Sequence, residues 1–213
     1  TRWATIVAMS FFLGCSNTLK IVGSLVEEEA YFQALKKLEE GLAKRPENQL
    51  LWLEQARIHL IYSETDEPIQ RTYHYQTAYY SFEEARRLGI DSTQNVEIDD
   101  LLQRYWVQEH NAGIHALESD EYTDRLRDAS SHLRNAIALK PNEISSYIAL
   151  TNAYYLAAKI KLAVKTLRDA QENLDAPNAQ IYEKLGFLSL EQGKIEDAIN
   201  FYQRSIEINN NKN

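Results

Sequence analysis

The sequence predicts an all-α protein built from a stacked helical repeat. The main observation is a spacing that recurs five times, in which a small residue is followed by a large one four positions later and by another small one three positions after that. The copies are Ala34–Leu38–Gly41, Ala78–Phe82–Ala85, Ala129–Leu133–Ala136, Ala163–Leu167–Ala170 and Ala198–Tyr202–Ser205. Seven glycines and four prolines among 213 residues also favour helix. Because one such unit cannot bury its apolar face alone, the copies are expected to stack.

The composition fits a soluble globular or solenoid domain. Charged residues make up 25% of the chain and hydrophobic residues 44%. The net charge of −8 argues against a nucleic-acid partner, because phosphates attract a basic surface. A single cysteine excludes a disulfide within the chain.

The N-terminus begins with the order basic, apolar, small, cysteine. Arg2 precedes an apolar run over residues 3–13, which is followed by Gly14 and Cys15. About eleven apolar or small residues suit the core of a signal peptide and are too few to span a bilayer about 30 Å thick. The order resembles a bacterial lipoprotein signal. That resemblance implies cleavage before Cys15, diacylation of its thiol and acylation of its new amine.

The lipoprotein resemblance divides the chain into a signal peptide over residues 1–14, a lipidated tether over 15–26 and a repeat domain over 27–213. Residues 16–26 could instead form a partial first helix. The alternatives for Cys15 are a buried position in a repeat helix and an uncleaved anchor. The residue after the cysteine is Ser16. An aspartate at this position would resemble a signal for retention in the inner membrane. The expected location is therefore the bacterial cell envelope, with lipid anchoring on the periplasmic face of the outer membrane if the organism has one.

Helices are expected in order over residues 27–45, 49–62, 70–88 and 94–118, followed by three standard units of helix and turn. Helical periodicity of apolar side chains predicts these segments, and proline and glycine end them. The helix over 70–88 is rich in tyrosine. Its spacing favours Tyr75, Tyr79 and Phe82 in the core, with Tyr73 and Tyr80 as an alternative binding rim. A glycine in the long fourth helix, Gly113, is expected at a close helix contact.

The later copies resemble the tetratricopeptide repeat (TPR) family, a stack of antiparallel helix pairs. The resemblance covers roughly residues 27–212 and is strongest over 129–208. About ten additional residues separate the two helices of an earlier copy. In the last two copies the resemblance is carried by Tyr147, Leu150, Tyr154, Ala163, Leu167, Ala170, Tyr182, Leu185, Gly186, Gly193, Ala198, Tyr202 and Ser205. Three prolines along the whole chain also follow second helices, as in the family: Pro46, Pro141 and Pro177.

The resemblance implies a concave groove lined by the first helix of each pair, where members of the family bind peptides. The exposed stripe that it implies includes Leu53, Leu60 and Leu190. The residues assigned to the groove are Arg57, Ile148, Asn152, Tyr155, Glu183 and Phe187. A solvated helix face without a ligand is the alternative for this surface.

No catalytic residues, metal or cofactor are expected. The five histidines, His59, His74, His110, His115 and His132, have none of the usual metal-ligand spacings, and no glycine-rich phosphate loop is present. The chain is predicted to be a non-catalytic, lipid-anchored scaffold of the cell envelope that binds other proteins or peptides. The alternatives are an accessory ligand-binding subunit of an envelope transporter or enzyme complex and, least favoured, a hydrolase with a spatially assembled site.

Overall fold

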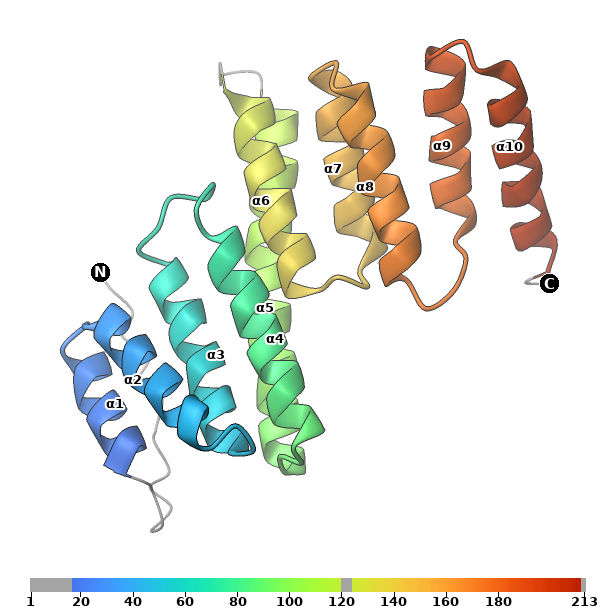
Figure 1. Cartoon of the computed structure of the whole chain (residues 1–213). Helices are drawn as coiled ribbons and strands as arrows, with labels where there is room; N and C mark the ends of the chain where they lie inside the picture. The colour runs from blue at the N-terminus through green and yellow to red at the C-terminus, as the bar shows by residue number, and fades with distance from the viewer. Residues whose placement is uncertain (1–16, 120–123, 212–213) are drawn as a thin grey trace.

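A computed structural model describes residues 17–119 and 124–211, and this part of the chain contains α-helices joined by turns and loops, without a β-strand (Figure 1). The predicted signal peptide and Cys15 lie outside the described residues. The helices are α1 (Asn17–Glu27), α2 (Tyr31–Lys44), α3 (Gln49–Ser63), α4 (Thr72–Arg87), α5 (Ser92–Glu118), α6 (Arg125–Leu139), α7 (Ile144–Leu156), α8 (Ile160–Asn173), α9 (Ala179–Glu191) and α10 (Ile195–Asn210).

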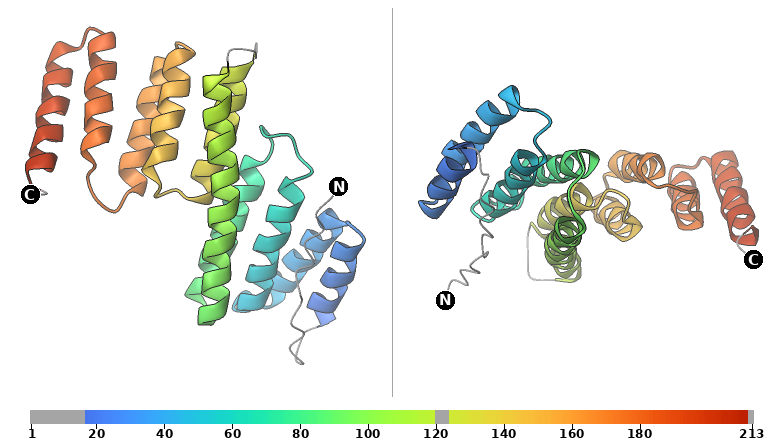
Figure 2. Two further views of the ribbon diagram at one scale, coloured as in Figure 1. Left: turned by 180° about the vertical axis from the view of Figure 1, so that it is seen from behind. Right: turned by 90° about the horizontal axis from the view of Figure 1, so that it is seen from below.

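Consecutive helices pair into hairpins, from α1 with α2 to α9 with α10, and the hairpins follow one another along the molecule (Figure 1). Seen end-on in the right-hand view of Figure 2, α4 and α8 lie towards one side and α5 and α7 towards the other. The prediction of an all-α helical-hairpin solenoid is confirmed. We call the surface formed by the first helices α5, α7 and α9 the first-helix face.

All five copies of the small–large–small spacing lie on second helices, and they form the packing contacts between helices. In the first four copies every member is buried, and the two small residues of the last copy, Ala198 and Ser205, are buried as well. The exception is Tyr202, which is half-buried with its ring against the backbone of Gly186. The residues of this spacing therefore make the main packing contacts of the solenoid.

Residues 17–27 form a packed helix, which is the second of the two alternatives for this segment. Val22 and Gly23 of α1 are buried, and Val22 belongs to a core that includes Leu38 of α2. The expected helix over 27–45 is interrupted before Tyr31, because Glu29 adopts a left-handed φ of 57°.

The long helix α5 joins the two halves of the molecule. Near its start, Ile98 and Leu102 pack in one core with Tyr75 and Phe82 of α4. Near its end, Gly113 lies against Leu133 of α6. Both halves of the solenoid are thus attached to one continuous helix.

The expected close contact at Gly113 is confirmed, and it gives a stability prediction. A Cβ atom at this position would lie 2.6 Å from Cγ and 2.9 Å from Cδ2 of Leu133, both far inside contact distance. We expect Gly113→Ala to lower the free energy of unfolding by about 1–3 kcal/mol, because the added methyl overpacks a buried contact. Urea denaturation measures the change.

A double-mutant cycle identifies the cause of this loss. In a chain that already carries Leu133→Ala, the Gly113→Ala change should cost much less, because the clashing atoms are gone. An equal cost in both backgrounds would contradict the overpacking explanation.

Candidate functional site

Most of the residues predicted for the groove lie on α7 and α9, the first helices of the last two hairpins. Asn152, Glu183 and Phe187 are exposed, and Tyr155 is half-exposed. Ile148 is half-buried against the core that α7, α8 and α9 share and contributes less to the surface. The structure thus brings the residues predicted from two separate copies to one surface.

Local sequence features set the position of α9. Asn178 caps its first turn, where its side-chain oxygen accepts a hydrogen bond from the backbone N–H of Gln180 at 2.9 Å. Gly193 follows the helix with φ of 72°, a conformation that glycine adopts without strain. These two features fix the ends of the helix that carries Glu183 and Phe187.

Side chains from α7 and α9 contact one another directly. The rings of Tyr155 and Phe187 meet edge to face with centroids 5.1 Å apart. The Tyr155 hydroxyl donates a hydrogen bond to Glu191 Oε2 at 3.0 Å, and this bond raises the pKa of the phenol. Lys184 Nζ lies 3.4 Å from Asn152 Oδ1 and donates a hydrogen bond to it. We call Asn152, Tyr155, Glu183, Phe187, Leu190 and Glu191 the α7–α9 patch.

Arg57, also assigned to the groove, lies on α3 and is engaged with other residues of the N-terminal half. Its guanidinium bonds Glu97 of α5 through Nη2 at 2.6 Å and Nε at 3.1 Å, and Glu54 at 3.3 Å. The structure does not bring it to the α7–α9 patch.

The expectation that Leu53 and Leu60 form an exposed stripe beside Arg57 is wrong, because each is only 1% exposed. Both pack in the core that α3 shares with α4 and the first half of α5. The extra length of α5 covers the surface where this stripe was expected.

The α5 part of the first-helix face contains a cluster that the sequence did not reveal. Trp106 stacks on His110, and Nε1 of the indole and Nδ1 of the imidazole both lie 3.0 Å from Oγ of Ser146 on α7. Burial lowers the pKa of His110, while Glu143 opposes the shift. The neutral imidazole therefore serves as a structural hydrogen-bonding group between α5 and α7.

The tyrosines of α4 are divided between core and surface as the spacing predicts. Tyr75 is 1% exposed, and Tyr79 is partly buried against the same core, whereas Tyr73 and Tyr80 are 64% and 57% exposed. The Tyr80 ring meets Trp52 edge-on with centroids 5.8 Å apart. The exposed pair remains the alternative binding surface.

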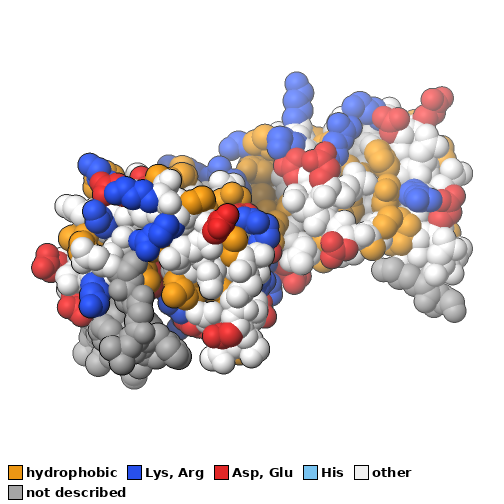
Figure 3. All heavy atoms as spheres, turned by 60° about the horizontal axis from the view of Figure 1, so that its bottom comes forward, with side chains coloured by type: hydrophobic (Ala, Val, Ile, Leu, Met, Phe, Trp, Pro, Cys, Tyr) orange, Lys and Arg blue, Asp and Glu red, His pale blue; other side chains and the backbone are white. Residues whose placement is uncertain are grey.

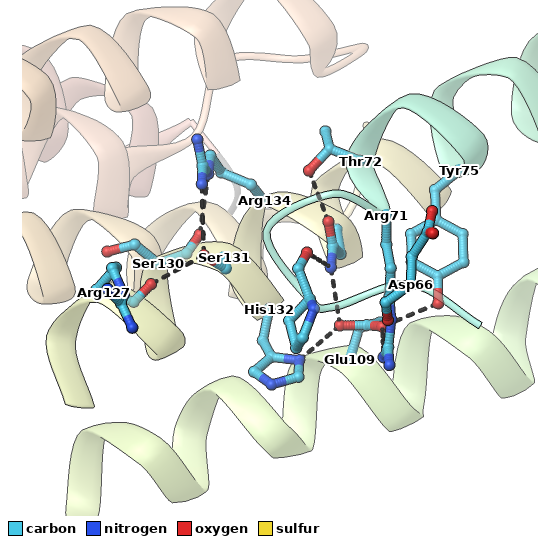
Figure 4. Close-up of polar contacts among 12 residues, drawn as sticks. Asp66, Arg71, Thr72, Tyr75, Glu109, Arg127, Ser130, Ser131, His132 and Arg134 are labelled. Atoms are coloured by element: carbon cyan, nitrogen blue, oxygen red, sulfur yellow. Dashed lines mark hydrogen bonds and ion pairs between the residues drawn. The ribbon is translucent and has the colours of Figure 1, made fainter. Parts of the chain in front are cut away.

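A buried carboxylate at the junction of the two halves is a further feature that sequence reasoning missed (Figure 4). Glu109 of α5 is 1% exposed. Its Oε1 accepts hydrogen bonds from Arg71 at 3.0 Å and the Tyr75 hydroxyl at 2.9 Å. Its Oε2 lies 2.7 Å from His132 Nδ1 and accepts a bond from Asn135 at 3.2 Å. Burial would raise the pKa of Glu109, but the four hydrogen bonds outweigh burial and hold it below its ordinary value.

The same cluster holds the loop between α3 and α4, which contains the additional residues noted in the sequence. Asn135 Nδ2 donates to the carbonyl of Pro68 at 2.8 Å, and Arg71 Nε donates to the carbonyl of Asp66 at 2.9 Å. Both oxygens of the Glu109 side chain are paired within the protein. This arrangement suits a structural joint and leaves no oxygen of Glu109 directed at a substrate.

A second buried polar contact, between α3 and α4, is a pair of histidines. Nδ1 of His59 and Nδ1 of His74 are 2.8 Å apart, and the opposite nitrogen of His74 lies 3.3 Å from Asp66. The rings of Tyr62 and Tyr73 enclose the pair. Burial, followed by repulsion from His74, lowers the pKa of His59 to about 4.

In the described residues, no group of three or more His, Cys, Asp or Glu side chains is placed to hold a metal ion. Open depressions of about 680 Å³ and 120 Å³ are lined by residues 44–50 and by residues between 171 and 182, and neither lining includes a residue of the α7–α9 patch. None of the described helices combines the length and apolar character that crossing a membrane requires.

Comparison with known proteins gives a partial match in sequence. No family model matches the chain. A TPR repeat-containing protein of Methanocaldococcus jannaschii is 27% identical over 92 residues, which are 43% of this chain and 16% of that protein. The match therefore spans about a sixth of the relative's length.

Among solved structures, MamA of Desulfovibrio magneticus RS-1 is 14% identical with a TM-score of 0.44, over 92% of this chain and 95% of that one. A thermophilic TPR protein of Thermus thermophilus is 20% identical with a TM-score of 0.37, over 90% of this chain and 89% of that one. The described residues form a helical-hairpin solenoid, and the 92-residue match supports TPR homology for that part of the sequence.

Proposed function

We propose that this protein is a non-catalytic scaffold that binds a partner protein or peptide through the α7–α9 patch. The observation that carries the proposal is the exposure of aromatic and aliphatic side chains next to polar groups on two adjacent first helices. Phe187 is 38% exposed and Leu190 48% exposed. Such mixed apolar and polar surfaces suit the recognition of peptide segments.

The contacts within the patch support this choice of surface. On the face shown in Figure 3, positive and negative side chains are scattered between hydrophobic ones over both halves of the molecule. In the patch, the ring contact and the hydrogen bonds between α7 and α9 already hold the side chains in place. Because such side chains lose little freedom on binding, they suit a recognition surface.

The test is the combined change of Asn152, Tyr155 and Phe187 to alanine. We expect capture of partner proteins from solubilised membranes to decrease by about an order of magnitude or more, given roughly 1 kcal/mol or more per effective contact. Quantitative mass spectrometry of the captured proteins measures the change. Circular dichroism should show an unchanged helix content, because none of the three side chains belongs to the small–large–small packing.

The control is Glu172→Lys on α8, where the side chain is exposed away from the patch. This variant should capture the same partners as the wild type. A folded triple variant that also captures them would contradict the proposal and direct attention to Tyr73 and Tyr80.

We also propose that the scaffold is attached to the cell envelope through lipid on Cys15. The basic, apolar and small residues before the cysteine support this part of the proposal. Two or more acyl chains give stable anchoring, whereas a single chain gives marginal binding.

In a host that processes lipoproteins, we expect Cys15→Ser to abolish labelling by a palmitate analogue and to leave the precursor uncut. Gel mobility and labelling measure the two effects. Ser16→Ala is the matched control and should be labelled and processed normally. Equal labelling of the wild type and Cys15→Ser would exclude this anchor.

A further inference from the structure

The charges of the α7–α9 patch point to a more specific ligand. Three patch residues of α9, Glu183, Phe187 and Glu191, follow one another at intervals of four positions and share one face of the helix. The two carboxylates therefore lie on either side of the exposed phenylalanine, at a rise of about 6 Å each.

This surface carries more negative than positive charge. The α7 sequence, ISSYIALTNAYYL, contains no charged residue. On α9 the one basic residue, Lys184, donates a hydrogen bond to the neutral amide of Asn152 and keeps its positive charge. Within the described residues, Glu183 has no ion-pair partner, and Glu191 accepts a bond from the neutral Tyr155 hydroxyl. Two carboxylates without a basic partner thus flank an apolar centre.

The spacing of the patch residues favours an extended ligand. The Tyr155 and Phe187 rings meet edge to face between α7 and α9, and Phe187 remains 38% exposed. An extended chain matches the row of residues on α9 in spacing. Its side chains alternate between two faces, so residues two apart point the same way and are separated by about 6.6 Å. This spacing is close to the rise of about 6 Å between successive members of the α9 row.

We propose that the patch binds an extended peptide segment with the pattern basic–any–apolar–any–basic. The two basic side chains pair with Glu183 and Glu191, and the apolar side chain packs on Phe187 and Leu190. This inference rests on the proposed function, because it names the ligand of the same surface.

The experiment uses a random peptide library displayed on phage and selected against the full chain. We expect the enriched sequences to share two basic residues four positions apart with an apolar residue midway. Binding of an enriched peptide is then measured by fluorescence anisotropy. The double variant Glu183→Lys/Glu191→Lys should bind it about tenfold more weakly or worse, because two attractive charge pairs become repulsive. At about 1 M salt, where screening acts beyond about 3 Å, the difference between wild type and variant should shrink.

The matched control is Glu196→Lys/Glu207→Lys on α10, which changes the net charge equally at exposed positions outside the patch. It should bind the peptide as the wild type does. An equal loss in the control, an acidic consensus, the absence of any consensus or basic residues eight apart in a helical pattern would each overturn the proposal.

The triple alanine variant separates this inference from the proposed function. If that variant loses peptide binding while the charge reversal keeps it, the patch is the binding surface and the proposed ligand chemistry is wrong. If both variants retain binding, the proposed surface is wrong as well.

Discussion

Replacing Glu109 by leucine should destabilise the protein by about 3–5 kcal/mol, which is the largest effect expected for a single substitution in this chain. Removing the carboxylate leaves the Arg71 guanidinium without its counter-charge and deprives the Tyr75 hydroxyl and the Asn135 amide of their acceptor. Buried groups that lose their partners cost the full desolvation penalty, whereas the native pairing compensates for it. Urea denaturation at neutral pH measures the loss.

The control for this experiment is an exposed ion pair. Glu207 pairs with Arg204 on the surface of α10, with side chains 59% and 51% exposed. Glu207→Ala should leave the unfolding midpoint nearly unchanged, because solvent screens such pairs. If Glu109→Leu has as small an effect as this control, the junction cluster is not important for stability.

The second large effect is a loss of stability in mild acid. The pKa of His59 is lowered to about 4, mainly by burial, whereas an unfolded histidine has a pKa of about 6.5. The unfolded chain therefore binds a proton at a pH where the folded protein does not. The contribution of neutral His59 is complete above about pH 6.5 and decreases as the pH falls towards 4.

The expected loss over this range is about 3 kcal/mol, from the difference between the two pKa values. Burial lowers the pKa of His74 as well, although Asp66 opposes the shift, so His74 adds a change of the same sign. Urea denaturation at successive pH values measures the dependence.

In His59→Gln the unfolding free energy should depend less on pH between 6.5 and 4, because the histidine with the pKa of about 4 is removed, while His74 and His110 retain a smaller dependence of the same sign. His115→Gln is the matched control at an exposed position and should retain the wild-type slope. A wild-type slope in His59→Gln would contradict the assignment of the acid sensitivity to this buried pair.

Local sequence determined which helices pack and through which side chains. The small residues of the recurring spacing, such as Ala78 and Ala163, are fully buried. Helical periodicity alone places these positions on one face, and their small size permits close approach of a neighbouring helix. Gly113 was recognised in the same way, because a glycine inside a helix is costly unless a close contact requires it.

The sequence also assigned Asn152, Tyr155 and Phe187 to neighbouring positions on successive first helices. Their placement follows from the repeat register, which is a local property of each copy. The structure adds the ring contact between Tyr155 and Phe187 and the hydrogen bond from Tyr155 to Glu191, because both depend on how closely α7 approaches α9.

The burial of Leu53 and Leu60 and the partners of Glu109 could be seen only in the tertiary structure. The two leucines are buried in one core with Ile98 and Leu102 of α5. Glu109 meets Arg71 and Tyr75 from positions 38 and 34 residues away, and the His59–His74 pair likewise joins two helices. Sequence periodicity reports which side of a helix is apolar, but it carries no information about which distant polar groups that helix will bring together. Those pairings depend on the packing of whole helices, and so they could be seen only in the folded molecule.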